Sequence, residues 1–236
     1  MKDTFGMALL DYFDNPESVH VLECDDGYLN TIKTGSYYYP FNDWMKVEQE
    51  LSRHVTGRVL DVGCGSGRSV KHYQEQGIEV VGIDVSMGAL EAAKKFGGEN
   101  CVLMDAMNLD FPSDSFDTVV LFGNGLGLCG LESRKMLEGL HRVVKPGGLL
   151  LASSRDPKKT DNPIHLAYHE HNRQQGKPIG LVRLRVNFGE VKGDWFDFYI
   201  LEPHEVEAFI TGTGWSLERL YNPDEPVYGV VLRNTD

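Results

Sequence analysis

The 236-residue chain lacks the features that mark several classes of protein. It has only four cysteines and no Cys-x-x-Cys pair, so the sequence indicates neither a disulfide framework nor a zinc site. It also has no basic leader and no apolar run near the ~20 residues that a membrane helix needs. We therefore expect a cytoplasmic protein with no membrane partner.

Positive charge is scarce as well. Lys and Arg number 23 against 35 for Asp and Glu, a formal net charge of −12. Because polyphosphate repels such a chain at long range, we expect no nucleic-acid partner. Residues 155–192 are the exception, since basic residues outnumber acidic ones there. That segment either binds an anionic group of a small molecule or balances acidic parts of the chain by packing near them.

What the chain does contain is a glycine-rich stretch, residues 59–68, with the sequence VLDVGCGSGR. A short apolar strand leads into glycine at every second position, and a helical pattern follows. Glycine lets a ligand approach the backbone amides closely. A dinucleotide fingerprint would need glycine where Arg68 stands, and the lysine of a phosphate-binding loop is absent.

The spacing of Asp61, Gly63, Gly65 and Gly67 resembles the first motif of class I S-adenosylmethionine-dependent methyltransferases, Asp/Glu-x-Gly-x-Gly-x-Gly. The resemblance implies S-adenosyl-L-methionine as cofactor and S-adenosyl-L-homocysteine as product. Cys64 lies within the motif, where it is either a small filler or a reactive thiol.

Two further acids, Asp84 and Asp105, stand at the ends of the next two predicted strands, as Asp61 does at the end of the first. Asp84 ends the strand over residues 79–84, and a β-α-β crossover places it beside the glycine loop, where its carboxylate can accept both ribose hydroxyls. Asp105 and Ala106 end a strand over residues 100–106 and resemble the adenine site of the family. The resemblance thus predicts a cofactor site made of Asp61, Gly63, Cys64, Gly65, Gly67, Asp84, Val85, Asp105, Ala106, Gly123 and Asn124.

The fourth predicted strand covers residues 118–122, and the loop that follows it indicates which class of acceptor the enzyme methylates. It lacks the Asn/Asp-Pro-Pro-Tyr sequence of enzymes that methylate amino groups of nucleic acids, and the strand-end acid of metal-dependent catechol-type enzymes. These differences favour a small-molecule acceptor and no metal. Asn124 in this loop either orients the substrate or holds a turn. His165 and His169 have helical spacing but no evident third ligand, so we predict no metal site.

Two segments flank the predicted core. In residues 1–54, helices over 4–13 and 42–54 enclose a turn-rich aromatic piece, and the resemblance implies a lid. The lid tyrosines either contact substrate or pack the helices. Residues 155–200 predict an inserted cap whose strands 181–188 and 194–200 form a hairpin over the substrate pocket. The candidate substrate residues are Tyr37, Tyr38, Tyr39, Arg183, Arg185 and Trp195.

The sequence therefore predicts a single α/β domain, a three-layer Rossmann-like sandwich with a mostly parallel seven-stranded sheet. An N-terminal helical lid (1–54) precedes the cofactor-binding core (55–154), the inserted antiparallel hairpin cap (155–200), and a C-terminal helix with antiparallel strands (201–236). We expect metal-independent methyl transfer to a small molecule by in-line displacement, because a sulfonium methyl is already electrophilic.

Several points stay open at this stage. The alternatives are a non-catalytic S-adenosylmethionine-binding module and, less favoured because of Arg68, a dinucleotide-dependent oxidoreductase. No catalytic residue is assigned, and the acceptor atom is oxygen, nitrogen or carbon. The oligomeric state is equally open, with a homodimer as one option.

Overall fold

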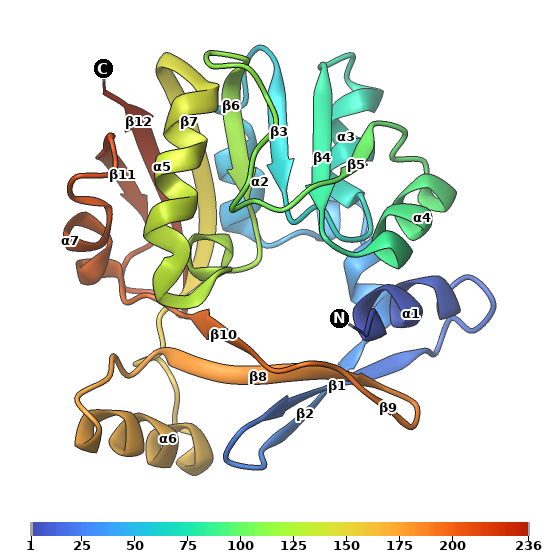
Figure 1. Ribbon diagram of the computed structural model, residues 1–236, viewed down its shortest axis with the longest axis vertical. Coiled ribbons are helices and arrows are strands. Elements are labelled where there is room, and N and C mark those ends of the chain that lie inside the picture. Colours follow the sequence, from blue (N-terminus) through green and yellow to red (C-terminus); the bar gives the residue numbers. More distant parts are fainter. Residues whose placement is uncertain (1, 236) are drawn as a thin grey trace.

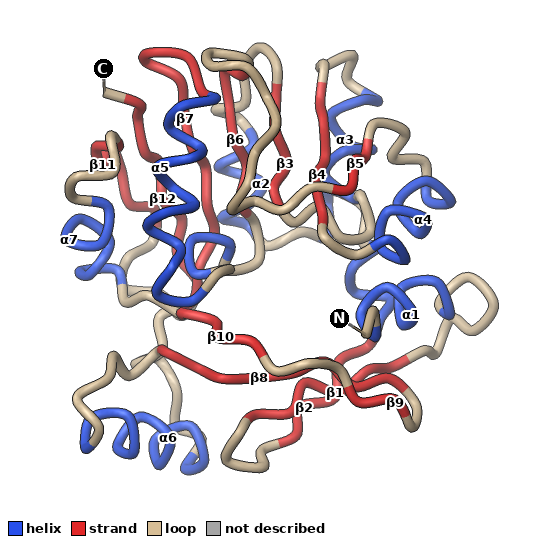
Figure 2. Tube along the Cα trace, viewed as in Figure 1, coloured by secondary structure: helices blue, strands red, loops and turns tan. Residues whose placement is uncertain are grey.

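The computed structural model describes residues 2–235, so Met1 and Asp236, the ends of the predicted lid and C-terminal segment, lie outside it. Two sheets organise the chain (Figures 1 and 2). A seven-stranded sheet occupies one half of the molecule, and a five-stranded sheet crosses below the carboxyl ends of its parallel strands. No helix among residues 2–235 is long and apolar enough to cross a membrane.

The seven-stranded sheet has the order β11-β12-β7-β6-β3-β4-β5. Its five strands from β7 to β5 are parallel, and β12 runs antiparallel to both β7 and β11. This arrangement confirms the predicted fold class. The strands are β3 (Val59–Val62), β4 (Val80–Asp84), β5 (Cys101–Leu103), β6 (Phe116–Leu121), β7 (Val144–Arg155), β11 (Trp215–Tyr221) and β12 (Val227–Asn234).

Helices cover both faces of this sheet because successive strand residues point to opposite sides. On β3, Leu60 packs into the core beneath α5, whereas Val59 packs into the core beneath α2 and α3. The helices of this half are α2 (Lys46–Ser52), α3 (Arg68–Glu75), α4 (Met87–Phe96), α5 (Ser133–Val143) and α7 (Val206–Ile210). Both faces of the central strands are thus covered by apolar layers, and the loops at the strand ends lie outside these layers.

The five-stranded sheet is antiparallel, with the order β10-β8-β1-β2 and β9 paired to β8. Its strands are β1 (Val19–Cys24), β2 (Leu29–Lys33), β8 (Leu181–Phe188), β9 (Val191–Lys192) and β10 (Phe196–Tyr199). The predicted hairpin is confirmed, since Leu184 of β8 lies opposite Phe196 of β10. The cap also contains the helix α6 (Pro163–Gln174), which the side chain of Asn162 caps.

Between the two helices of the lid, β1 and β2 form a hairpin that the sequence did not predict. The first helix is α1 (Thr4–Asp11), slightly shorter than predicted. The second, α2, begins at Lys46, later than predicted, because a 3-10 turn occupies Phe41–Asp43. Local pattern gave no sign of β1, since one of its two partner strands, β8, comes from the distant cap.

Two strand boundaries also differ from expectation. β5 ends at Leu103, which leaves Asp105 in the following turn rather than at the strand tip. β7 begins at Val144 and runs through the Pro-Gly-Gly sequence that predicts a turn, with an irregular register against β6. In both cases the sheet partner, not the local sequence, sets the limit of the strand.

Candidate cofactor and acceptor site

The glycine loop leaves β3 and enters α3 with its glycines in left-handed conformations. Gly67, at φ +75°, caps α3, and a Cβ there would lie only 2.7 Å from Cβ of Ala93 in α4. Gly65, at φ +53°, faces the ring of Phe5, which is 3.7 Å from the position a Cβ would take. The loop therefore presents bare backbone to the space between core and lid.

Asp84 lies at the tip of β4, directly beside this loop, as predicted. Its Oδ2 accepts from the amide of Gly65 and its Oδ1 from the amide of Ser86, each at 2.9 Å. Burial raises the pKa of Asp84. Because each carboxylate oxygen accepts more than one hydrogen bond, Asp84 can still receive a pair of ligand hydroxyls. Val85 follows with 60% of its surface exposed, an apolar face on the same edge.

The two residues of the predicted adenine site lie one strand further along the edge. Asp105 is exposed, and its Oδ1 accepts from the amide of Met107 at 2.9 Å, whereas Ala106 packs into the core. β4 and β5 pair in parallel with Asp84 opposite Leu103. The turn that carries Asp105 thus follows a strand adjacent to that of Asp84, although the carboxylate itself is partly engaged by its own turn.

Asp61 is the buried acid of the motif, with 3% of its surface exposed. Burial raises its pKa to about 7; the charge of Arg68 opposes this shift, and Asp84 and Glu48 add to it. Its buried Oδ2 has no hydrogen-bond partner within residues 2–235. Since an unpaired buried carboxylate oxygen is costly, the site suits a ligand that brings a cationic N–H donor.

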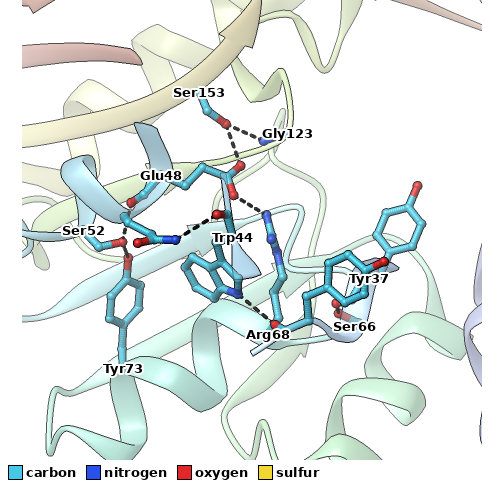
Figure 3. A network of polar contacts seen from close by, with 11 residues as sticks. Tyr37, Trp44, Glu48, Ser52, Ser66, Arg68, Tyr73, Gly123 and Ser153 are labelled. Carbon is cyan, nitrogen blue, oxygen red and sulfur yellow. Dashed lines mark hydrogen bonds and ion pairs between the residues drawn. The ribbon is translucent and has the colours of Figure 1, made fainter. Parts of the chain in front are cut away.

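A buried network connects the lid to this loop, and sequence analysis did not predict it (Figure 3). Glu48 of α2 is fully buried; its Oε2 pairs with Nη2 of Arg68 at 2.8 Å, and its Oε1 accepts from Oγ of Ser153 at 2.9 Å. The same Oγ accepts from the amide of Gly123 at 2.8 Å. The sequence signal for the burial of Glu48 is its spacing: it precedes Leu51 by three residues, which places both side chains on the inward face of α2.

Asn124 holds the turn that follows β6. It has φ +69°, its Oδ1 accepts from the amide of Arg155 at 2.7 Å, and its own amide donates to the carbonyl of Ser153 at 2.9 Å. The chain then forms 3-10 turns over Gly125–Gly127 and Gly130–Glu132, where Gly127 packs against the backbone of Tyr199 in β10. The cap therefore reaches over the loop after β6.

Of the three tyrosines predicted to contact substrate, only Tyr37 lies against the glycine loop. Its carbonyl accepts from Oγ of Ser66, and burial raises the pKa of its hydroxyl. Tyr38 is buried, and its hydroxyl donates to the carbonyl of Leu9 at 2.7 Å, so it packs α1. Tyr39 is exposed, and its carbonyl accepts from the indole of Trp44. We therefore keep Tyr37 alone as a candidate for acceptor contact.

His20 of β1 lies in the same aromatic cluster and was not predicted. It is 1% exposed, and its ring centroid is 6.0 Å from that of Phe5 and 5.6 Å from that of Tyr37. Nδ1 lies 3.2 Å from Oγ1 of Thr34, while Nε2 has no partner in the part of the chain that the structure describes. Burial lowers its pKa to about 4, so the imidazole is neutral at physiological pH.

The two cap arginines already have carboxylate partners. Arg183 pairs with Asp197 at 3.3 Å, and Arg185 donates to both carboxylate oxygens of Glu23, at 2.7 and 3.0 Å. The guanidinium of Arg185 also lies 4.3 Å from the ring centroid of Trp195. Ion pairs within the five-stranded sheet account for the positive charge of Arg183 and Arg185. An anionic acceptor is therefore not needed to explain these two arginines.

The remaining sulfur and imidazole candidates have structural surroundings. Cys64 is buried against Gly82 of β4, and the thiol of Cys101 together with burial raises its pKa, so it acts as a filler. His165 contacts Thr160 and the ring of Tyr28. Within the described residues, no group of three or more His, Cys, Asp or Glu side chains is placed to hold a metal ion.

Comparison with known proteins agrees with this geometry. A family model described as a methyltransferase domain matches residues 59–148. The chain is 33% identical, over 73% of each sequence, to a demethylmenaquinone methyltransferase of Renibacterium salmoninarum. It is 35% identical, over 41% of its own length and 39% of the relative's, to a malonyl-[acyl-carrier protein] O-methyltransferase of Salmonella typhimurium. A SAM-dependent methyltransferase from Bacteroides fragilis, solved in complex with S-adenosyl-L-homocysteine, superimposes with a TM-score of 0.83 at 23% identity, over 100% of this chain and 96% of that one.

Proposed function

This chain belongs to the class I S-adenosylmethionine-dependent methyltransferases, and from that premise we propose that it methylates a small-molecule acceptor without a metal. The observation that carries the proposal is the glycine loop with the Asp84 carboxylate bonded to the amide of Gly65. The names of two relatives specify demethylmenaquinone and malonyl-[acyl-carrier protein], neither of which is a nucleic acid. The net charge of −12 also argues against a polyanionic partner.

We assign the cofactor contacts from the polar groups and bare backbone of the site. Asp84 receives the ribose hydroxyls, and the unpaired Oδ2 of Asp61 receives the ammonium of the methionine end. The exposed Val85, with Asp105 and Ala106 on the next turn, borders the adenine. The loop glycines allow close approach. Cys64 contributes backbone only, because its side chain packs against Gly82, and Gly123 borders the site with open space on its Cα, while its amide donates to Oγ of Ser153.

When bound, the sulfonium of the cofactor supplies an electrophilic methyl carbon, so the protein must chiefly hold an acceptor in line and exclude water. Such alignment is worth ~7–11 kcal/mol of barrier lowering. We place the acceptor between the glycine loop and the five-stranded sheet, against Phe5, Tyr37 and His20. Nε2 of His20, which has no partner in the described part of the chain, is there to hydrogen-bond to the acceptor, as donor or acceptor according to the tautomer of the ring.

We also propose a cytoplasmic location. All four cysteines, Cys24, Cys64, Cys101 and Cys129, are free thiols. A reducing compartment keeps thiols in this state. Fractionation of cells expressing the tagged protein tests this point, and recovery in an oxidising compartment would contradict it.

The test of the function is calorimetric titration with S-adenosylmethionine, S-adenosylhomocysteine and NAD in parallel. We expect micromolar binding of the first two and none of NAD. Small phenols, amines and quinols are then screened as acceptors, with formation of S-adenosylhomocysteine as the readout. Binding of NAD alone would overturn the proposal.

A further inference from the structure

The buried charges beside the glycine loop do not balance. Two carboxylates, Asp61 and Glu48, are at least 97% buried, and one guanidinium, that of Arg68, lies with them. Arg68 donates to Oε2 of Glu48 at 2.8 Å, whereas Oδ2 of Asp61 has no partner among residues 2–235. Burying a second carboxylate without a cation is unfavourable, so the site lacks one positive charge.

The carboxylate and the backbone of Glu48 in α2 are fixed by hydrogen bonds to neighbouring residues (Figure 3). Ser153 donates to its other carboxylate oxygen at 2.9 Å, and Ser52 donates to its carbonyl at 2.8 Å. On the Arg68 side, the guanidinium carbon lies 4.6 Å from the ring centroid of Trp44. Glu48 and Trp44 therefore engage Arg68 from α2 and the segment before it, and Asp61 remains unpaired.

We propose that Glu48 is a positioning residue: by pairing with Arg68 it keeps Asp61 available for the ammonium of the cofactor's methionine end, and cofactor binding then expels a proton. The inference rests on the proposed cofactor site. The step balances, because a protonated Asp61 carboxyl and the ligand ammonium give a carboxylate-ammonium pair and one proton released to solvent.

The pKa of Asp61 determines how the affinity for the cofactor changes with pH. Burial raises the pKa of Asp61 to about 7, so the free protein carries part of a proton there at neutral pH. The titratable or charged groups that face it are Arg68 and Tyr73 from α3, Glu48 from α2, Asp84 from β4 and Cys64 from the glycine loop. An ammonium beside Asp61 lowers its pKa, so the ligand binds more tightly as pH rises from 6 to 8.

The experiment compares S-adenosylhomocysteine with 5′-methylthioadenosine, which shares the adenosine and thioether but lacks the ammonium and carboxylate. Calorimetry at pH 6, 7 and 8, in buffers of different ionisation enthalpy, counts protons released. We expect S-adenosylhomocysteine to release about half a proton at pH 7 and to bind about tenfold more tightly at pH 8 than at pH 6. 5′-Methylthioadenosine should do neither, and any titration of Asp84 cancels because both probes carry the ribose.

Glu48→Gln tests the positioning role directly. Without the carboxylate, Arg68 is free to pair with Asp61, so proton release and the difference in pH dependence between the two probes should disappear. Binding of 5′-methylthioadenosine should stay within about twofold, and Glu48→Asp should recover part of the proton release. Glu50→Gln on the same helix is the matched control and should behave as the wild type.

The outcomes separate the two claims. If neither probe binds, the proposed function is wrong. If both bind and the wild type releases no more protons with S-adenosylhomocysteine than with 5′-methylthioadenosine, the linkage is wrong and the function stands. Full proton release by Glu48→Gln overturns the role of Glu48. Should that variant fail to fold, Asp61→Asn replaces it: retained proton release there shows that Asp61 is not the titrating group.

Discussion

At the scale of single residues, Asp61 and Asp84 differ in how their carboxylates are satisfied. Asp84 accepts from two backbone amides, which fixes its orientation at the tip of β4. Asp61 is more deeply buried and has one oxygen without a partner inside the described range. Asp84 is therefore oriented to position a ligand. Asp61 has an unpaired buried oxygen, and a ligand that donates to it removes the energetic cost of that burial.

Asp84→Ala should weaken binding of S-adenosylhomocysteine by about 10- to 100-fold, since hydrogen bonds to a charged group contribute ~1.5–3 kcal/mol. Calorimetry measures the affinity, and circular dichroism verifies the fold. Glu91→Ala, on the exposed face of α4, serves as the control. An unchanged affinity in folded Asp84→Ala would remove Asp84 from the ribose site.

Asp61 also makes the stability of the free protein depend on pH. Its pKa is about 7 when folded against an ordinary value of 3.8, so the folded state binds more protons than the unfolded state between these values. The free energy of unfolding therefore falls as pH rises from about 4 to 7. Thermal melts at pH 5 and pH 8 should show Asp61→Asn gaining stability relative to the wild type at the higher pH. An equal difference at both pH values would contradict the assignment.

His20→Ala should lower kcat for any acceptor found by screening while leaving the Kd of S-adenosylhomocysteine within about twofold. The reason is that Nε2 is placed in the aromatic cluster rather than on the cofactor loop itself. Single-turnover rates and calorimetry provide the two readouts. His54→Ala, whose imidazole bonds to Tyr221 in another part of the molecule, is the matched control. Parallel loss of kcat in both variants would assign His20 a structural role.

At the scale of elements, the strand pair β1 and β8 joins the lid to the cap. Across it, Arg185 donates to Glu23 and holds the pKa of that carboxyl at about 2, with help from Asn187. In addition, Oγ1 of Thr4 in α1 donates to the carbonyl of Val186 at 2.7 Å. The lid and cap are therefore one antiparallel sheet with α1 fastened to it, rather than two independent covers.

Glu23→Gln should loosen this sheet and increase cleavage of residues 176–193 by trypsin. Asp197→Asn is the comparison, because its pair with Arg183 is about half exposed on both sides and contributes little. The depressed pKa means that the stabilisation by Glu23 is present above its unfolded pKa of about 4.5 and is lost only as pH falls towards 2. Equal cleavage of the two variants at pH 7 would argue against the cross-strand pair.

At the scale of the whole molecule, the lid meets the core at the glycine loop and the start of α4, and the cap joins the lid through the pairing of β8 with β1. Phe5 lies on Gly65, the carbonyl of Tyr37 binds Ser66, and Asp3 accepts from the amide of Gly88 at the start of α4. A ligand seated in the loop therefore braces the lid against the core, and the pairing of β1 with β8 carries this support to the cap. This continuity favours one cooperative unit.

S-adenosylhomocysteine at 100 times its Kd should raise the Tm by about 5–10 °C, since binding adds ~2.7 kcal/mol and each kcal/mol shifts a domain of this size by ~2–4 °C. Calorimetric scans with and without ligand measure the shift. We expect a single transition in both. Two transitions, with only one moved by the ligand, would show that lid and core unfold separately.

The sequence by itself determined the Rossmann-like core and singled out Asp61 and Asp84 as candidate cofactor residues. Strand, glycine loop and helix succeed one another within residues 59–75, and the acids at 61 and 84 stand where a repeated β-α unit must place them. These features depend on interactions between neighbours in the chain, or on one crossover of known handedness. Local periodicity and spacing are therefore sufficient to predict them.

Only the tertiary structure decided the rest of the site. β1 owes its pairing to β8, Glu48 is buried because α2 packs beside Arg68 and Ser153, and His20 lies among rings from α1 and the segment after β2. Arg185 of the cap likewise gained its partner, Glu23, from β1. Each of these contacts joins segments far apart in the chain, and burial and charge pairing between such segments leave no local pattern in the sequence.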